Sequence, residues 1–159
     1  MTPDDQRYMR MAINKARAGM AAGGSPFGAT IVGPAGDVIA CEHNVVWQTT
    51  DATAHAEVTA IRAACRAASA IKLPGATIYS TTEPCPMCFS AIHWAAVARI
   101  VYGSSIADAR RAGFSELNIS NADMKRLGGS EVEIVGGFMA DEANELFAAW
   151  VANEGRRVY

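Results

Sequence analysis

The sequence predicts one α/β domain over residues 1–159, built as three layers in which helices cover both faces of a central mixed sheet of about five strands. Three observations predict this fold class. The chain has the length of a single domain. Helical and strand-like patterns alternate between residues 55 and 102, and such alternation gives right-handed crossovers between parallel strands. A hairpin pattern ahead of them adds antiparallel pairing, so the sheet is expected to be mixed.

The N-terminal part is expected to hold one helix followed by the hairpin. Thr2–Asp5 offers a capping hydroxyl, a proline at the first helical position and two acids in the first turn, and apolar residues then recur at helical spacing. Ala29–Val32 and Val38–Cys41 are typical of strands, and Gly33–Asp37 between them is typical of a turn. The second strand is expected to run on to Asn44.

The middle of the chain alternates helix and strand. A helix is expected to start near His55, with Asp51 or Thr53 as its cap. The strand Ala76–Ser80 follows, and then a helix from Pro86 through about Ala96. The residues expected on the buried side of the first of these helices are Val58, Ile61, Cys65 and Ala68.

The last third has weaker patterns. They predict a strand over Arg99–Tyr102, a short helix over Ile106–Arg111, a short apolar strand over Val132–Val135 and a final helix over Asp141–Asn153 that ends before Gly155. The inward-facing residues expected on the final helix are Leu146, Phe147, Trp150 and Val151.

A metal-binding pattern is formed by His55-Ala56-Glu57 and Thr82–Cys88. Residues at i and i+3 of a helix are neighbours, so the sulfurs of Cys85 and Cys88 can reach one ion. Pro86 suits the first helical position, which places Cys85 at the cap, where the positive end of the helix dipole favours thiolate. With the imidazole of His55, the predicted ligand set is His/Cys/Cys.

Glu57 indicates that the predicted metal site is catalytic. Three protein ligands to zinc are typical of a catalytic site, because the fourth position is left for water. A carboxylate two residues from His55 can move the proton of that water instead of serving as a ligand. His-x-Glu followed by Pro-Cys-x-x-Cys is a signature of zinc nucleobase deaminases.

A Cys-x-x-Cys pair alone would also suit a redox pair or half of a structural zinc site. Here no second such pair completes a four-cysteine site, and a redox pair leaves His55 and Glu57 unexplained. A non-catalytic zinc or redox module therefore stays the alternative from a different class.

The composition indicates a small-molecule substrate. The formal net charge is -2, whereas proteins that bind nucleic acid through phosphates usually have a basic surface, so a nucleic-acid partner is not expected. No basic segment followed by an apolar core opens the chain, and no apolar run of about 18 residues occurs. We therefore expect a cytoplasmic protein without a membrane partner.

The chain resembles the cytidine-deaminase-like zinc hydrolases and, among them, the small bacterial guanine deaminases. The motifs that carry the resemblance are Pro26–Ala29, Ala54–Arg62, Glu83–Cys88, Ala112-Gly113-Phe114 and the last residue, Tyr159. The zinc motif is specific for the superfamily, while guanosine and tRNA adenosine deaminases share much of the same frame. The resemblance implies the cytidine-deaminase-like fold and one Zn²⁺ per subunit, held by His55, Cys85 and Cys88.

The resemblance also implies roles around the metal. Glu57 would be the general acid and base, and Glu116 a second catalytic carboxylate, although Glu116 would also suit a solvated surface. The amide of Asn44 would hold the base, or else serve a turn, while Phe27 and Trp94 would line the pocket. Tyr159 would close the site.

The resemblance further implies a homodimer in which residues 137–159 are exchanged, so that Tyr159 completes the partner's site. The activity implied is hydrolytic deamination of guanine to xanthine and ammonia. Guanosine, another amino-substituted heterocycle or tRNA adenosine are the alternative substrates. No role is assigned to His93, which stands where the resemblance leads us to expect an aromatic residue.

Overall fold

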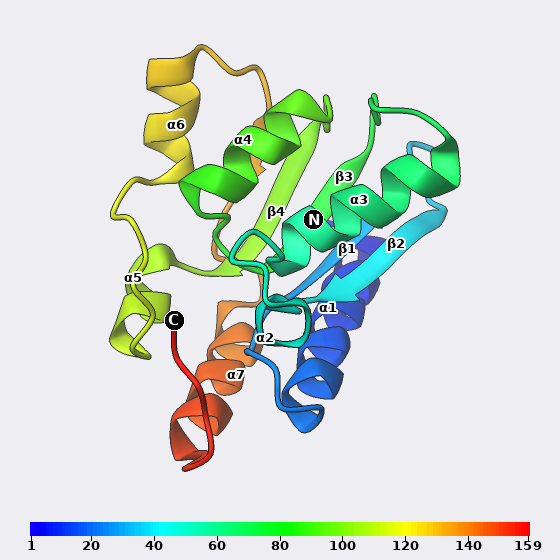
Figure 1. The fold of residues 1–159 in the computed structure, drawn as a ribbon. Helices are drawn as coiled ribbons and strands as arrows, with labels where there is room; N and C mark the ends of the chain where they lie inside the picture. Colours follow the sequence, from blue (N-terminus) through cyan, green and yellow to red (C-terminus); the bar gives the residue numbers. More distant parts are fainter.

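A computed structural model describes residues 1–159 as a five-stranded mixed sheet with helices on both faces (Figure 1). The strands are β1 (Gly28–Val32), β2 (Val38–His43), β3 (Thr77–Thr82), β4 (Arg99–Ser104) and β5 (Glu133–Val135), in the spatial order β2-β1-β3-β4-β5. β1 pairs antiparallel with β2 and with β3, whereas β3 and β4, and β4 and β5, pair in parallel. The predicted fold class is confirmed.

The helices are α1 (Pro3–Ala21), α2 (Val46–Thr49), α3 (Ala56–Ala68), α4 (Pro86–Trp94), α5 (Ile106–Arg111), α6 (Asn121–Gly128) and α7 (Ala140–Ala152). Side chains alternate across a strand, and this alternation divides the core into two clusters. Ile78 packs with residues of α3 and α4, while its neighbour Tyr79 packs with residues of α1 and α7. Helices therefore cover both faces of the sheet, with α3 and α4 on one face and α1 and α7 on the other (Figure 1).

The direction of the strands determines where a site can form. Because β1 is antiparallel to both β2 and β3, the strands β2, β3, β4 and β5 all run the same way. Their carboxyl ends share one edge of the sheet. α3 follows β2 and α4 follows β3, so both helices begin at that edge with their N-termini close together. Sites in open α/β sheets form at such edges.

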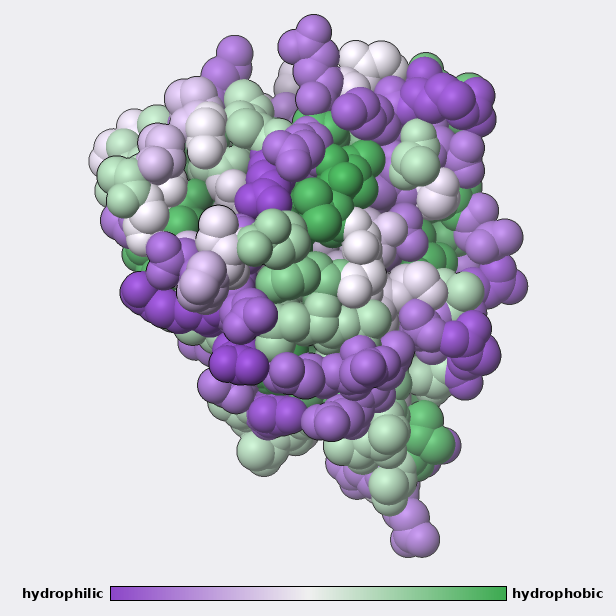
Figure 2. All heavy atoms as spheres, turned by 180° about the vertical axis from the view of Figure 1, so that it is seen from behind, coloured by the Kyte–Doolittle hydropathy of each residue, from purple (hydrophilic) through white to green (hydrophobic).

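α1 and α7 cover the opposite face of the sheet and expose their own outer sides to solvent. Ion pairs join Arg10 to Glu142 at 3.7 Å and Arg17 to Glu145 at 3.4 Å. The molecule seen from behind mixes hydrophilic and hydrophobic residues over its surface (Figure 2). None of the helices is long and apolar enough to cross a bilayer.

Several sequence expectations need correction. The buried side of α3 is lined by alanines at 56, 60 and 64, so Cys65 is only half-buried and Ala68 is exposed. These small residues let the helix approach the sheet closely, but they give a weak periodic signal. In α7, Ala143, Leu146, Phe147 and Trp150 face inward, and Val151 lies past the edge of that stripe and is exposed.

Other helix boundaries also differ from expectation. α4 ends at Trp94 because Ala96 takes a positive φ of 53°, which stops the helix before the residue expected to end it. Two helices were not expected. α2 has only four residues, and α6 is capped by Ser120 and ends at Gly129 in the left-handed conformation. β2 ends at His43, so Asn44 lies just after the strand.

Candidate active site

The three predicted metal ligands converge where α3 and α4 begin. His55 and Cys85 are the N-cap residues of the two helices, and Cys88 lies one turn into α4. Pro86 occupies the first turn of α4, as expected, because its missing N–H needs no partner there. The ligand atoms of His55, Cys85 and Cys88 all lie within 4.8 Å of one another.

The geometry of these atoms fits zinc. Nδ1 of His55 lies 3.7 Å from Sγ of Cys85 and 3.5 Å from Sγ of Cys88. Tetrahedral Zn²⁺ with its usual bond lengths to sulfur and nitrogen needs such ligands roughly 3.6 Å apart. The pattern of three protein ligands and one open position is that of a catalytic zinc site. The chain is thus a zinc protein with one ion per subunit.

The charges of the two cysteines also suit a cation. A hydrogen bond from Cys88, and after it one from His55, lowers the pKa of Cys85 to about 4 although burial opposes this change. Cys85 is therefore a thiolate at neutral pH. The proton between the sulfurs stays on Cys88, because that hydrogen bond and burial raise its pKa. Binding of a metal ion displaces such a proton.

Glu57 lies beside the ligands without joining them. Its side chain is buried, Oε1 accepts a hydrogen bond from the Ser80 hydroxyl at 3.0 Å, and Oε2 lies 3.5 Å from Sγ of Cys88. Burial raises the pKa of Glu57. A buried carboxyl group held by one hydroxyl next to a metal centre is suited to accept and return a proton.

A small cavity of about 10 Å³ adjoins these groups. It can hold about one water molecule. The residues that line it are Phe27, His55, Glu57, Thr82, Glu83, Cys85 and Glu116. Phe27 and Glu116, which come from distant parts of the sequence, therefore lie in the same site as the metal ligands.

Glu116 is the second carboxyl group of this cavity. It lies in the irregular segment between α5 and α6. Burial, reinforced by the negative charge of Cys85, raises the pKa of Glu116 to about 7. The side chain therefore changes protonation state near neutral pH, unlike a solvated surface glutamate.

Asn44 and Tyr159 meet at the edge of the site. Nδ2 of Asn44 donates a hydrogen bond to the phenol oxygen of Tyr159 at 2.5 Å, and Oδ1 of Asn44 accepts one from the backbone N–H of Val46. Asn44 thus both supports the start of α2 and directs its N–H₂ toward the site. The ring of Tyr159 lies 5.8 Å from the His55 ring and 5.8 Å from the Phe114 ring.

Trp94 does not lie with the other predicted pocket residues of this chain. Its side chain is 79% exposed, and it borders a separate hollow together with residues of α6. Trp94 ends α4, whereas Cys85 precedes that helix, and a rise of about 1.5 Å per residue separates the two by more than two turns. His93 lies beside Trp94 and contacts the hydroxyl of Ser130 at 3.3 Å.

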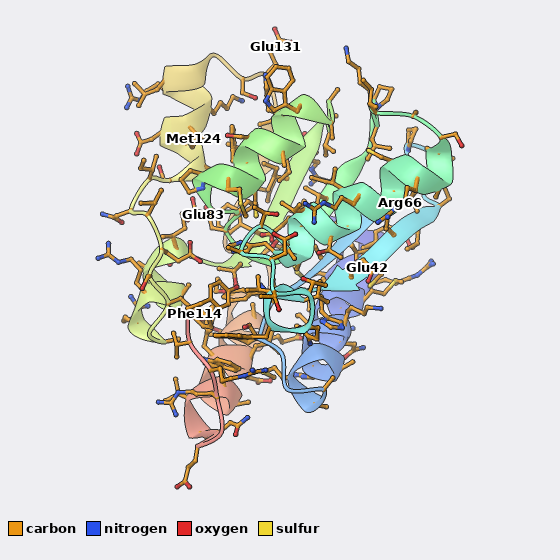
Figure 3. All side chains as sticks on the ribbon, viewed as in Figure 1. Glu42, Arg66, Glu83, Phe114, Met124 and Glu131 are labelled. Carbon is orange, nitrogen blue, oxygen red and sulfur yellow. The ribbon has the colours of Figure 1, made fainter.

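Glu83 has a structural role that sequence reasoning missed. Its Oε1 accepts a hydrogen bond from the N–H of Asn121 at 2.8 Å, and its Oε2 accepts one from the N–H of Ile106 at 3.3 Å. These are the first residues of α6 and α5. Figure 3 labels Glu83 near the start of α4 and Phe114 near the C-terminal end of the chain.

Trp47 and Ser80 were also missed. The indole N–H of Trp47 donates a hydrogen bond to the carbonyl of Arg157 at 3.1 Å, and Ser80 contacts Glu57. The sequence gives no spacing signal for either contact, because the partners are far apart along the chain.

Comparison with known proteins agrees with this geometry. Residues 2–104 match the family model for the cytidine and deoxycytidylate deaminase zinc-binding region. The guanine deaminase of Bacillus subtilis is 44% identical over 112 residues, which are 70% of this chain and 71% of that protein. The tRNA-specific adenosine deaminase of Bacillus subtilis is 32% identical over 146 residues, covering 92% of this chain and 88% of that protein.

Solved structures share the fold. A guanine deaminase from Nitrosomonas europaea superposes with a TM-score of 0.87 at 27% identity, covering 96% of this chain and 86% of that one. The structure of the Bacillus subtilis guanine deaminase gives a TM-score of 0.66 at 43% identity, covering 71% of each chain. The match of the family model over most of the chain, together with a His/Cys/Cys cluster whose geometry fits zinc, shows that this chain belongs to the cytidine and deoxycytidylate deaminase zinc-binding family.

Proposed function

We propose that this protein is a zinc-dependent hydrolase that deaminates guanine to xanthine and ammonia. The observation that carries the proposal is that Asn44 and Tyr159 cover the metal site beside Phe27, Glu57 and Glu116. A flat base packs well against the rings of Phe27 and Tyr159 once the tyrosine has moved off Asn44 to admit it, whereas a ribose or an RNA strand would keep Tyr159 from returning over the site. The similarity to guanine deaminases from two bacteria supports this choice of substrate.

The metal ligands and Glu57 have separate roles in the hydrolysis. His55, Cys85 and Cys88 would hold a zinc ion, which when bound would lower the pKa of water to about 7 and so supply a nucleophile at neutral pH. Glu57 takes the proton from the attacking water and delivers it first to a ring nitrogen and then to the departing amine. The bond from water oxygen to the ring carbon forms, the bond from that carbon to the amine breaks, and ammonia leaves.

The remaining pocket residues hold the base and exclude water. The amide of Asn44 donates to an oxygen or ring nitrogen of the base, and the ring of Phe27 packs against the flat purine. Glu116, with a pKa of about 7, handles a proton on the ring or on the leaving amine at neutral pH. Tyr159 covers the open side.

A tRNA adenosine deaminase is the second candidate. It is favoured by the similarity to the tRNA-specific adenosine deaminase of Bacillus subtilis, which extends over 92% of this chain. The net charge of -2 speaks against it, because binding of tRNA depends on contacts with many phosphates. Guanosine and other amino-substituted heterocycles are further alternative substrates, and measuring ammonia release from each of them tests these alternatives.

We also propose a homodimer of this single domain in the cytoplasm. Residues 157–159 pack against the site of their own chain here, and the exchange of residues 137–159 between subunits stays a prediction. Mixing two inactive variants tests it, one with Glu57→Gln and one without Tyr159. An exchanged dimer places both defects in one site of the mixed species and leaves the other site intact, so activity returns. Unexchanged dimers stay inactive.

The decisive experiment measures ammonia release by the zinc-loaded protein. Guanine, guanosine, adenine, cytosine, cytidine and a tRNA with adenosine at the wobble position are compared at neutral pH, with Glu57→Gln as the matched control. Strong preference for guanine supports the proposal. Turnover of the tRNA alone, with binding that weakens steeply as salt is added, favours the second candidate. Zinc binding without turnover of any of them would return the chain to the non-catalytic alternative.

A further inference from the structure

The last three residues of the chain, Arg157–Tyr159, are attached at a point outside the metal site. The indole N–H of Trp47 donates to the carbonyl oxygen of Arg157 at 3.1 Å, and the guanidinium carbon of Arg157 lies 4.6 Å from the centre of the Trp47 ring. One side chain thus holds both the backbone and the side chain of Arg157. We call Arg157–Tyr159 the tail.

Trp47 is itself fixed relative to the site. It is the second residue of α2, and the first residue of that helix donates its backbone N–H to Oδ1 of Asn44. The same Asn44 donates through Nδ2 to the phenol oxygen of Tyr159. α2 therefore connects two points at which the tail is held, one at Arg157 and one at the phenol of Tyr159. α2 is a four-residue helix that the sequence did not predict, and these contacts give it a clear structural role. The carbonyl oxygen of Tyr159 also accepts a hydrogen bond from the N–H of Ser115 at 3.4 Å.

The closed tail leaves no room for a base. The remaining cavity of about 10 Å³ is far smaller than a purine ring, and Tyr159 already occupies the N–H₂ group of Asn44. The amide of Asn44 can donate to a base, as proposed above, only after Tyr159 has left it. The contact between Trp47 and Arg157 lies beyond the lining of this cavity and does not have to break when Tyr159 moves.

We propose that Trp47 is a positioning residue that keeps the tail attached at Arg157 while Tyr159 moves off Asn44 and returns over the bound base. The anchor, which is the contact between Trp47 and Arg157, limits the mobile part of the chain to Val158 and Tyr159. The Tyr159 ring therefore returns to one position over the site, which a longer mobile segment would not ensure. This inference rests on the proposed function for the identity of the base. The attachment of the tail itself can be measured without any substrate.

NMR of protein with ring-¹³C-labelled tyrosine reports the position of Tyr159 directly. The chain has four tyrosines, and Tyr159→Phe identifies the signal of interest. In the wild type the neighbouring rings of His55, Phe114 and Trp47 are expected to shift this signal. Trp47→Phe keeps a ring but removes the N–H, and we expect the Tyr159 signal to move toward the position of a solvent-exposed tyrosine.

Two arginine variants separate the anchor from general effects. Arg157→Ala removes the guanidinium over Trp47 and is expected to move the Tyr159 signal in the same direction by a smaller amount, because the carbonyl contact remains. Arg156→Ala is the matched control: Arg156 bonds to carbonyls at the end of α7 and not to Trp47, so the signal should stay in place. The ring of Trp47 also lies 6.4 Å from the ring of Tyr159, and of the two variants that affect the anchor only Arg157→Ala leaves that ring contact unchanged. An unmoved Tyr159 signal in Trp47→Phe or in Arg157→Ala would therefore overturn the proposal whatever the enzyme turns over.

Kinetics then test the consequence for catalysis. The anchor is present with and without a base, so its loss should change KM less than about twofold, while kcat falls about fivefold, the typical effect of one lost hydrogen bond. The same Trp47→Phe change made together with Tyr159→Ala should lower kcat no further. An equal loss of kcat in both backgrounds would mean that Trp47 acts on the site directly and would overturn the positioning role. If none of the substrates is turned over, the proposed function fails, and the NMR comparison still decides the attachment of the tail.

Discussion

The hydroxyl of Ser80 in β3 donates a 3.0 Å hydrogen bond to the carboxylate of Glu57 in the first turn of α3. This contact joins the sheet to the residue that we expect to move protons. The other oxygen of Glu57 faces Cys88, so the carboxyl group is held between a strand and a metal ligand. Its orientation is therefore fixed before any substrate arrives, which is what efficient proton transfer requires.

Replacing Glu57 with Gln is expected to abolish turnover and leave zinc bound. The amide keeps the shape of the side chain and can still contact Ser80, but it cannot take a proton from water. General acid and base catalysis contributes about 10²–10⁴-fold, so kcat should fall by at least that range. Elemental analysis measures whether zinc stays bound, and ammonia release measures the loss of turnover. Substantial remaining activity would take the general-base role away from Glu57.

Chelation is expected to remove activity that added Zn²⁺ restores. Both sulfurs and Nδ1 of His55 must lose or lack protons to bind the ion, so the affinity for zinc should weaken as the pH falls below neutral. Cys85→Ala removes one of three ligands and should leave less than one zinc per chain. A variant that retained full zinc and full activity would exclude Cys85 from the ligand set.

Glu116→Gln is expected to lower kcat by about tenfold to a hundredfold without loss of zinc. The carboxyl group has a pKa of about 7 and can exchange a proton at neutral pH, which the amide cannot. Glu116→Asp is the matched control, because it keeps an ionisable group on a shorter side chain and should retain more activity than Gln. Equal rates for the wild type and both variants would make Glu116 a bystander at the edge of the cavity.

Removal of Tyr159 is expected to damage catalysis more than stability. The phenol contacts Asn44 and the ring of Phe114, but the tail adds little to the core of the domain. The melting temperature should change by only a few degrees, while kcat/KM falls because water reaches the site. Thermal unfolding and steady-state kinetics on the same sample compare the two. An unchanged rate would show that the terminal tyrosine does not close the pocket.

Asp5→Asn is expected to destabilise the fold at neutral pH and not in strong acid. Burial would raise the pKa of Asp5, but hydrogen bonds from Thr2 and Tyr79 and the charge of Arg99 outweigh it and lower the pKa to about 2. A depressed folded-state pKa stabilises the fold above the unfolded pKa of about 3.9, and this contribution disappears as the pH falls toward 2. The contribution at pH 7 is about 2 kcal/mol.

Urea unfolding at pH 7 and across pH 4 to 2 measures this dependence. The wild type and Asp5→Asn should differ at pH 7 and converge as the acid titrates. A difference that stays constant down to pH 2 would mean that the ionised carboxylate of Asp5, with its hydrogen bonds from Thr2 and Tyr79 and the charge of Arg99, is not its source.

The sequence predicted the metal site well because the necessary information is local. His55 and Glu57 are two residues apart, Cys85 and Cys88 are three apart, and Pro86 marks the helix start between them. Spacing on one helix fixes which side chains share a face, so no knowledge of distant contacts was required. The hairpin and the alternation of β3, α4 and β4 were predicted for the same reason.

The rest depends on contacts between distant residues. Trp94 was expected in the pocket but lies exposed at the far end of α4. A resemblance between motifs does not determine how far a side chain lies from the metal ligands of its own chain. The contact of Trp47 with Arg157 spans 110 positions, and that of Asn44 with Tyr159 spans 115. No periodic pattern reports such pairs. α6 was missed because its helical stripe is short and it begins after an irregular segment.

Glu83 has a consequence for how this enzyme could diversify. Its two oxygens fix the first residues of α5 and α6 to the metal-binding loop, and the irregular segment with Glu116 lies between those fixed points. Residues 115–120, which follow the buried Phe114, can therefore change in length or composition while the ligands of the ion stay where they are. Evolution, or a protein engineer, can redirect the same metal centre to a different amino-substituted ring by rewriting this one segment.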